Sequence, residues 1–512
     1  MKNSPQLLCL SAIVLVLLLG LGCGSSSPIQ PSVALVPTTH PLVAQYNISR
    51  INLGASTWVE FGPDTSYGRQ TSKVPAVGSN ILNDTVSILV AGMKPQTTYH
   101  MRAHAEWPGG SWDDQDRTFT TGALPSSLIL PSFTVAAPVS GVSAKPAPGV
   151  ELFSLIAPSN AQGVVTDLEG NIIWYCPGNA FPIKPLTNGH YIINTTNDLL
   201  EVDLTCNVIR DISAAQVNAS LQANGYSFTI PPATSLPTGS GGQFHHDVVV
   251  MPNGHWIALC EIIQNFDNLP GYSGTMSVVG DALVDLDTNG NVSWAWSSFD
   301  HLDINRHLQG LPDWTHSNAI VPMSDGNLLV SMRNQSWILK IDYSNGTGSG
   351  DVLWRLGDGG DFTILGGDPS QWFYGQHYPN ILSTNGSQMT LAVFDDGNQR
   401  VDIDGTACGV TPACYTRAAT YQLDEDTKVA DVLWQDLPGF YTFWGGSIGV
   451  LSNGDVEFDA SEPSPSVARS SIVMEVTQTN TPQTVWQMNV TGENAYRGYR
   501  IPSLYPSVTW KQ

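Results

Sequence analysis

The chain has 512 residues, of which 42% are hydrophobic and 13% charged, against roughly 25% charged in typical soluble domains. Its 44 acidic and 21 basic side chains give a formal net charge of −23. So acidic a field argues against nucleic acid as a partner and against electrostatic docking on anionic lipid. The 48 glycines and 34 prolines, with no long amphipathic helix, indicate β-structure with tight turns.

The N-terminus has the features of an export signal. Residues 1–22 contain Lys2 and then an apolar run without charge that is short for a membrane span. Cys23 follows, before Gly-Ser-Ser-Ser-Pro, and this arrangement resembles a bacterial lipoprotein lipidation site. Simple cleavage nearby with release is the alternative. Either way we expect an exported protein, periplasmic or attached to the outer membrane or cell surface, with the Pro/Ser-rich residues 23–43 as a tether.

Export to an oxidising compartment permits disulfides. Cys408 and Cys414 bracket a short Gly-Val-Thr-Pro-Ala loop and are predicted to form a local bridge. Cys176 and Cys206 are a second candidate pair, and Cys260 is left over. No cysteine or histidine spacing is typical of zinc, so no structural metal is predicted.

Residues 44–121 read as a compact unit of short alternating strands. Its segment Met93-Lys-Pro-Gln-Thr-Thr-Tyr99, followed by the alternating HMRAHAE, resembles the tyrosine corner and next strand of a fibronectin type III domain. We assign this unit no chemistry. Residues 122–149, rich in Pro, Ala and Ser, are predicted to be a linker.

From residue 150 onward the chain repeats itself. One repeated element is an Asn/Asp-Gly turn after an apolar strand, and a second is an apolar–acidic–apolar strand that leads to a strand often carrying Trp. Six copies of four strands each predict a six-bladed β-propeller over residues 150–512, with the tryptophans packed between neighbouring blades. The second element occurs as VVTDLEGNIIWY, LLEVDLTCNVIRDI, ALVDLDTNGNVSWAW, ILKIDYSNGTGSGDVLWRL, TYQLDEDTKVADVLWQ and IVMEVTQTNTPQTVWQ.

The first blade lacks an innermost strand in its own segment. The C-terminal NAYRGYRIPSLY is strand-like and has no blade of its own, so we expect it to pair with Glu151–Ile156 and close the ring. Arg497 or Arg500 would then face the axis and add positive charge there.

Three histidines fall at one position of the repeat when the turn glycines are aligned. This position is the start of the innermost strand, so we expect three imidazoles around one pocket at the axis. They are His245, nine residues before Gly254, His377, nine before Gly386, and His316, ten before Gly326. Strand alternation puts His245, and not His246, on the inner face, unless a β-bulge re-aims the strand.

The histidines have polar company in a predicted hairpin over residues 312–335. His316 and Asn318 share one face, and Arg333 returns on the partner strand in an otherwise apolar run. Three histidines could bind zinc, but an arginine at the same place would oppose a cation. The mixture better suits an oxyanion with several oxygens, a sulfate or phosphate ester, because Arg donates in a planar fork and His can attack, protonate or donate near neutral pH.

The chain from about Val150 to its end resembles the bacterial arylsulfate sulfotransferases. The motifs that carry the resemblance are GGQFHHDVVVMPNG, DWTHSNAIVPMSDGNLLVSMRNQS, VLWRLG, the QH of FYGQHYPN, and FDDGNQR with YTRAATYQLDE. The resemblance implies an exported six-bladed propeller that moves sulfuryl groups from a phenolic sulfate donor to a phenol acceptor. It implies a ping-pong route through a sulfated histidine, with no nucleotide and no cofactor.

The resemblance also implies roles for residues of this chain. His377 is the expected nucleophile, with His316, Arg333 and His245 as its catalytic partners. A second set of residues is expected to bind substrate: Asn318, His246, Arg400, Arg417 and Arg500. Of these, Arg400 and Arg417 would line the mouth of the pocket unless they are ordinary surface residues. The alternative function is a surface propeller that binds a sulfated or acidic ligand without turning it over, because a fold does not determine a function.

Overall fold

The computed structural model describes residues 31–77, 85–137, 139, 141–156, 158–236, 242–409, 411–463 and 468–510. Almost every element in them is a β-strand, with short α-helices at α1 (Ala214–Ala223) and α2 (Ser298–His301), so the predicted all-β class is confirmed. None of the described helices is long and apolar enough to cross a membrane. The predicted export signal and Cys23 lie outside the described residues.

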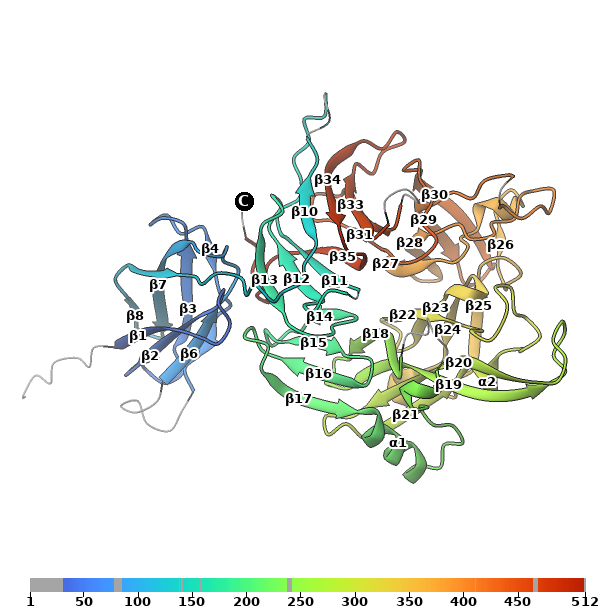
Figure 1. Cartoon of the computed structure of the whole chain (residues 1–512), viewed down its shortest axis with the longest axis horizontal. Helices are drawn as coiled ribbons and strands as arrows, with labels where there is room; N and C mark the ends of the chain where they lie inside the picture. Colours follow the sequence, from blue (N-terminus) through green and yellow to red (C-terminus); the bar gives the residue numbers. More distant parts are fainter. Residues whose placement is uncertain are drawn as a thin grey trace, which may run out of the picture.

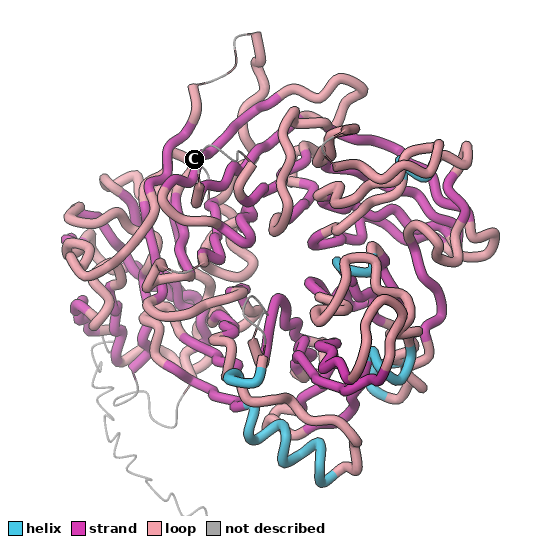
Figure 2. Tube along the Cα trace, turned by 45° about the vertical axis from the view of Figure 1, so that its right-hand side comes forward, coloured by secondary structure: helices cyan, strands magenta, loops and turns pink. Residues whose placement is uncertain are grey.

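Six sheets follow one another around a ring in the described part of residues 132–501, the arrangement of a β-propeller (Figures 1 and 2). The first strands of the third to sixth sheets contact one another in turn around the axis. The second, third and fourth sheets are β14 (Ile183–Pro185), β15 (Tyr191–Asn194), β16 (Asp198–Val202) and β17 (Val208–Ser213); β18 (Phe244–Val250), β19 (Trp256–Asp267), β20 (Thr275–Leu286) and β21 (Val292–Ser297); and β22 (Ser317–Pro322), β23 (Leu328–Met332), β24 (Trp337–Ile341) and β25 (Val352–Leu356).

The fifth and sixth sheets each carry one added outer strand. In the fifth, β26 (Thr363–Ile364) pairs in parallel with the last strand, and in the sixth, β10 (Ser132–Val135) pairs with the last strand. Their other strands are β27 (His377–Asn385), β28 (Gln388–Asp395), β29 (Arg417–Asp424) and β30 (Val429–Asp436), then β31 (Ser447–Val450), β32 (Val456–Ser461), β33 (Ser470–Val476) and β34 (Thr484–Thr491).

The first sheet is completed by the C-terminal strand. β35 (Ala495–Ile501) pairs antiparallel with β11 (Val150–Leu155), from Val150 opposite Ile501 to Leu155 opposite Ala495. Outside β11 lie β12 (Gly163–Thr166) and β13 (Ile172–Cys176). The predicted closure of the ring by this segment is therefore confirmed, and it covers edges that would otherwise be free to pair with another chain.

The repeated tryptophans join neighbouring sheets, as predicted. Four of them donate the indole Nε1–H to a backbone carbonyl of the next sheet, at 2.8 to 3.1 Å. The pairs are Trp174 with Leu204, Trp294 with Gly348, Trp434 with Thr479 and Trp486 with Leu168. A buried indole needs such an acceptor, so each tryptophan both fills and fixes the seam between two sheets.

The N-terminal domain, at the left of Figure 1, consists of two sheets packed on each other. Tyr99 accepts a hydrogen bond on its hydroxyl oxygen from the backbone N–H of Lys94 at 3.0 Å, which is the contact of a tyrosine corner. One sheet has β1 (Ser32–Pro37), β2 (Ala44–Ser49) and β6 (Thr85–Val90), and the other has β3 (Ser56–Gly62), β4 (Arg69–Gln70), β5 (Val74–Pro75), β7 (Thr98–Trp107), β8 (Gly110–Asp113) and β9 (Arg117–Thr120).

Two predicted boundaries differ from the structure. The tether predicted over residues 23–43 contains β1, which pairs with β2 over its whole length, so this domain includes residues from Ser32 onward. The linker predicted over residues 122–149 contains β10, which belongs to the sixth ring sheet. Both segments are rich in Pro and Ser, and composition did not reveal that each supplies an outer strand, a position that tolerates Pro.

The last part of the chain docks the N-terminal domain onto the ring. The Tyr505 hydroxyl donates to the carbonyl of Leu89 at 2.8 Å and accepts from the N–H of Ala91 at 2.7 Å. Trp510 donates its Nε1–H to the carbonyl of Gln70 at 2.9 Å and is buried. One apolar cluster continues from the N-terminal domain into the first two ring sheets.

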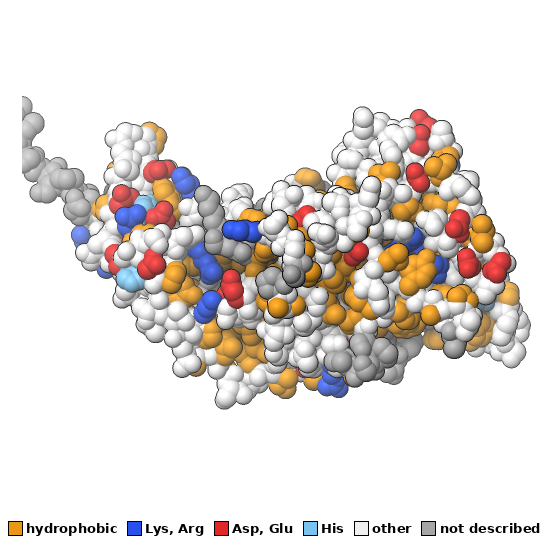
Figure 3. Space-filling view, turned by 90° about the horizontal axis from the view of Figure 1, so that it is seen from above, with side chains coloured by type: hydrophobic (Ala, Val, Ile, Leu, Met, Phe, Trp, Pro, Cys, Tyr) orange, Lys and Arg blue, Asp and Glu red, His pale blue; other side chains and the backbone are white. Residues whose placement is uncertain are grey.

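The surface of the two parts differs in charge on the face that Figure 3 displays. Acidic and basic side chains are mixed on the N-terminal domain, at the left, and acidic side chains predominate at the far end of the ring.

Trp510→Ala tests this docking. The variant loses a buried aromatic side chain at the domain boundary, which costs about 3–5 kcal/mol where the site does not collapse. Scanning calorimetry should then separate one transition into two, with the N-terminal domain unfolding first. Val77→Ala, at a residue that is 76% exposed, is the control and should behave as the parent chain does. A single unshifted transition in Trp510→Ala would contradict the docking role.

Candidate active site

A cavity of about 630 Å³ opens where the inner strands of the ring begin. Basic and aromatic side chains supply most of its wall, and they come from segments that are far apart in the sequence. The lining residues are Ile156, Gln162, Asn179, Phe181, Thr196, His246, Asp313, His316, Arg333, His377, Phe443, Trp444 and Tyr496. The predicted gathering of histidines from three consecutive ring sheets in one pocket is therefore observed, although one of the three differs from the prediction.

His377, the first residue of β27, has both ring nitrogens engaged. Its Nδ1 lies 2.5 Å from Asp396 Oδ2, and its Nε2 lies 3.3 Å from the backbone N–H of Gly445. An N–H can only donate, so Nε2 carries a lone pair and Nδ1 carries the proton. Burial, and then the charges of Arg333, His316 and Arg497, hold the pKa of His377 well below its ordinary value. His377 is thus a neutral imidazole with a lone pair at the pocket.

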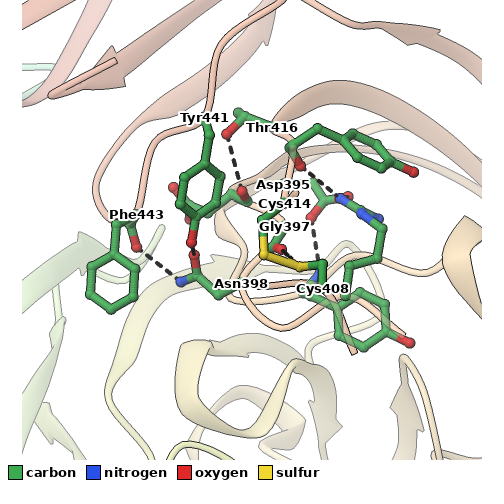
Figure 4. Close-up of a disulfide and its surroundings, with 12 residues drawn as sticks. Asp395, Gly397, Asn398, Cys408, Cys414, Thr416, Tyr441 and Phe443 are labelled. Carbon is green, nitrogen blue, oxygen red and sulfur yellow. Dashed lines mark hydrogen bonds and ion pairs between the residues drawn. A yellow bond between two sulfur atoms is a disulfide. The ribbon is translucent and has the colours of Figure 1, made fainter. Parts of the chain in front are cut away.

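The loop after β28 supplies Asp396 and also supports the pocket wall. The disulfide Cys408–Cys414 closes this loop (Figure 4), so that predicted pair is confirmed; Cys176 and Cys206 are bonded as well. Within the loop, Asn398 donates its amide to the carbonyl of Phe443 at 2.9 Å and accepts from the Tyr441 hydroxyl at 2.8 Å. These bonds fix the segment that carries Phe443 beside the loop that orients His377.

Arg333 and His316 sit just outside their strands, and not on strand faces as predicted. His316 precedes β22 with φ +48°, and Arg333 opens a 3₁₀ turn, Arg333–Gln335, directly after β23. That turn holds the opposite loop, because Asn334 donates to the carbonyl of Asp313 at 2.8 Å and Gln335 to that of Trp314 at 2.6 Å. The interlocked segments fix the two basic side chains relative to each other.

His316 has one polar partner at the pocket, and Arg333 has two: the carbonyl of Phe443 and Asn334 Oδ1, to which it donates at 2.8 Å. His316 Nδ1 lies 2.5 Å from Asp313 Oδ2. The Arg333 guanidinium donates to the carbonyl of Phe443 at 2.9 Å and lies 5.1 Å from the centre of that ring. Its Nε is buried with no hydrogen-bond partner in the structure. Arg333 therefore retains donor capacity for an anion in the pocket.

The third histidine of the pocket is His246, the alternative that the sequence left open for a bulged strand, and not His245, which was preferred. The ladder between β18 and β19 shifts register between Phe244 and Val248, and His246 has φ +51°. This irregularity re-aims the strand, so His246 faces the cavity, with its ring centre 4.7 Å from that of His316. His245 points away from the cavity toward Asp281, 3.2 Å from its Nε2.

A family model for the arylsulfotransferases (ASST) matches residues 142–500. The chain belongs to the arylsulfotransferase family. No curated protein matches it.

Solved structures resemble this member of the family only distantly. A protein of unknown function from Bacteroides caccae is 10% identical, with a TM-score of 0.38 over 69% of this chain and 98% of its own. A Lactobacillus plantarum protein is 12% identical, with a TM-score of 0.34 over 67% and 82%. Virginiamycin B lyase from Staphylococcus aureus is 9% identical, with a TM-score of 0.29 over 70% and 99%.

Four of the residues that the sequence predicted to bind substrate lie outside the cavity. Asn318 is fully buried, does not line the cavity, and donates its amide to the carbonyl of Gln376 at 2.7 Å. Arg400 and Arg417 are buried and share the carboxylate of Asp395, at 2.8 and 2.7 Å. These arginines satisfy a buried charge and several backbone carbonyls, so they neither line the mouth nor lie on the surface.

Arg500 is the fourth of these residues. It is enclosed by Glu151, Glu457 and Glu475, with 3.0 Å to Glu457 Oε1 and 2.9 Å to Glu475 Oε2. Of the two arginines on the closing strand, Arg497 takes the position toward the axis, where it pairs with Asp247 at 3.3 Å. One of the two alternatives offered by the sequence is therefore correct.

The sequence reasoning missed the carboxylates and the aromatic wall. Asp396 stands in the Asp-Asp of FDDGNQR, and Asp313 stands three residues before His316, so both were visible inside motifs already singled out. Tyr496, on the closing strand, lines the cavity with its ring centre 5.9 Å from that of His377. Among the described residues, no group of three or more His, Cys, Asp or Glu side chains is arranged to hold a metal ion.

Arg500→Met tests the assignment of Arg500 to packing. It leaves three buried carboxylates without their cation, which should cost about 3–5 kcal/mol of unfolding free energy at neutral pH. Burial and the neighbouring Glu151 already raise the pKa of Glu457 well above its ordinary value. Removing the cation raises the folded-state pKa of Glu457 further, and stability from such a group is lost as pH rises, so the deficit should shrink in acid.

Urea unfolding at pH 7 and pH 5 measures this deficit, and the exposed Arg469, changed to Met, is the control. The Michaelis constant for 4-nitrophenyl sulfate should stay that of the parent chain. A raised Michaelis constant with unchanged stability would restore Arg500 as a substrate ligand.

Proposed function

We propose that this chain transfers a sulfuryl group from a phenolic sulfate ester to a phenol through a sulfohistidine at His377. The observation that carries the proposal is the neutral His377 imidazole, whose Nε2 lone pair lies in a pocket lined by Arg333, His316 and His246. A neutral imidazole is a nucleophile, and the basic groups around it suit the oxygens of a sulfate ester.

In the first half-reaction the His377 Nε2 lone pair attacks sulfur. The N–S bond forms as the bond between sulfur and the aryl oxygen breaks, and the electron pair of that bond leaves with the phenolate oxygen. His316, oriented by Asp313, gives a proton to this oxygen. In the second half-reaction His316 takes the proton of the acceptor phenol, whose oxygen attacks sulfur, and the N–S electron pair returns to Nε2.

Two donors support the charge on the sulfuryl oxygens. One is Arg333, and the other is the N–H of Gly445, which is released when Nε2 directs its lone pair at sulfur. The backbone at Gly445 has φ +72°, and a Cβ there would lie 2.5 Å from Ser461 Oγ. Glycine is thus the residue that permits this N–H to approach His377.

The aromatic wall supports an aryl substrate. Phe181, Phe443, Trp444 and Tyr496 line the same cavity as the basic groups. Flat rings favour stacked or edge-on contacts with other rings, so a phenol is held by its ring while its oxygen reaches the basic groups.

Export directed by residues 1–22, with lipidation at Cys23, belongs to the same proposal. The protein would then act in the periplasm or at the cell surface.

Incubation with 4-nitrophenyl sulfate, with and without phenol, tests the reaction, and the mass of the protein tests its route. Nitrophenol should accumulate only with phenol present, and the donor alone should add ~80 Da, the mass of SO₃, to the peptide that contains His377. His377→Ala should lose both signals, and His190→Ala, a histidine paired with Glu201 outside the pocket, should keep them. Release of more than one equivalent per protein without phenol would indicate a sulfatase. No release with any donor would favour the alternative, a surface propeller that binds a sulfated or acidic ligand without turning it over.

Asp396→Asn tests how His377 is set up. The amide of Asn donates to Nδ1 and drives the ring proton to Nε2, which removes the lone pair while the geometry stays the same. We expect the rate of adduct formation to fall by about 10⁴-fold, as for an orienting carboxylate in a catalytic triad. Rapid-quench measurement of nitrophenol release gives this rate, and circular dichroism checks the fold. A loss of less than tenfold would show that Asp396 does not set the tautomer.

A further inference from the structure

A buried pair of residues, His245 and Asp281, lies directly behind His246 and does not line the cavity. His245 is 1% exposed, and its Nδ1 is 2.7 Å from the Nδ1 of His246. On its other side, His245 Nε2 is 3.2 Å from Asp281 Oδ1. The second oxygen of Asp281 accepts the backbone N–H of Ser317 at 2.6 Å. The contacts run from a buried carboxylate, through one imidazole, to a second imidazole at the pocket.

One proton lies between the two Nδ1 atoms, and the surrounding charges decide which ring carries it. Burial alone would lower the pKa of His245, but Asp281, with Glu261 and Asp313 farther off, raises it above its ordinary value. Burial, and then the positive charges of His316, His245 and Arg497, hold the pKa of His246 well below its ordinary value. The proton therefore belongs to His245, which donates to His246.

We propose that the His245–Asp281 pair is a positioning device that fixes the tautomer of His246. A neutral His246 that accepts at Nδ1 keeps its own proton on Nε2 and presents an N–H donor to the pocket. Its role, which rests on the proposed sulfuryl transfer, is to bind a sulfuryl oxygen.

The same device explains why only one histidine takes the sulfuryl group. His377 is fixed by Asp396 with a lone pair on Nε2, and His246 is fixed by His245 with a proton on Nε2. Two imidazoles of one pocket thus have opposite tautomers, set by different buried partners. An Nε2–H cannot attack sulfur, so His246 is a donor and His377 is the nucleophile.

Two substitutions at His245 separate tautomer control from packing. In His245→Asn the side-chain amide nitrogen takes the place of Nδ1 and still donates to His246, while His245→Leu fills the space without a donor. We expect kcat/KM for 4-nitrophenyl sulfate to fall about 10²-fold or more in His245→Leu, as on loss of one oriented donor. His245→Asn should recover at least tenfold of that loss.

The matched control is His255→Leu, because His255 pairs with Asp285 on the same sheet at 2.9 Å and lies outside the cavity. It removes a similar His–Asp pair and should leave the kinetics unchanged. Equal losses in His245→Leu and His245→Asn would reduce His245 to a packing residue and overturn the proposal.

A measurement on the resting protein is independent of turnover. Nitrogen NMR of the full chain with ¹⁵N-labelled histidine, with His246 identified from the signals lost in His246→Gln, should show Nε2 protonated in the parent and in His245→Asn. In His245→Leu the Nδ1 form should appear. A parent protein with His246 protonated on Nδ1 would overturn the proposal even if transfer is established. If no sulfuryl transfer is detected, the NMR spectra still show whether the His245–Asp281 pair fixes the tautomer of His246. Titration calorimetry with inorganic sulfate then tests whether His246 donates a hydrogen bond to a bound sulfate oxygen.

Discussion

Each imidazole that faces the pocket is held by a carboxylate, directly or through a second histidine, and the site depends on this arrangement. His377 has Asp396, His316 has Asp313, and His246 has Asp281 through His245. Without such partners, several basic groups in one water-poor cavity would repel one another and would not keep defined protonation states. Asp396 and Asp281 lie outside the cavity, behind the rings, whereas Asp313 lines the cavity beside His316.

Closure of the ring contributes to the same balance. The closing strand β35 brings Arg497 under the pocket, where it pairs with Asp247 and donates to the carbonyl of Asn318. Asp247 also pairs with Lys184 and accepts the N–H of Ile320 at 2.9 Å. One ionic cluster thus joins the first four sheets at the axis. The positive charge of Arg497 is among the causes of the low pKa of His377, so the last strand of the chain tunes the site as well as closing the ring.

The ring of sheets could be predicted because residues that recur in the sequence make recurring structural contacts. Four of the repeated tryptophans reach a carbonyl of the next sheet, whereas the buried Nε1 of Trp354 has no hydrogen-bond partner in the structure. In three copies the acidic residue of the repeat caps its own turn: Asp167, Asp203 and Asp287 accept from the N–H groups of Asn171, Asn207 and Asn291. The pocket could be predicted in outline because the histidines share one repeat position.

The direction and the partners of individual side chains were harder to predict, because they depend on local irregularities of the backbone and on residues distant in the sequence. Strand alternation selected His245, but the bulge at His246, with its left-handed backbone, reverses the faces. An arginine in an apolar run also looks the same whether it serves a ligand or a buried carboxylate. Arg333 lines the cavity, whereas Arg417 is surrounded by acceptors outside it, and only the three-dimensional neighbours distinguish them.

The motifs of this family member are explained as much by contacts between inner strands as by contacts with substrate. In HSN, His316 turns to the pocket, while Asn318 holds the carbonyl of Gln376, the residue before His377. Gln376 in turn donates to the carbonyl of Trp337 at 2.9 Å, and its neighbour Gly375 donates its N–H to Ser336 Oγ at 3.1 Å. The segments HSN, SMRNQ and GQH therefore fix one another's backbones. A sequence pattern of this kind specifies where the nucleophile stands before it specifies what the nucleophile meets, because a misplacement of about 1 Å can cost on the order of 10²-fold in rate.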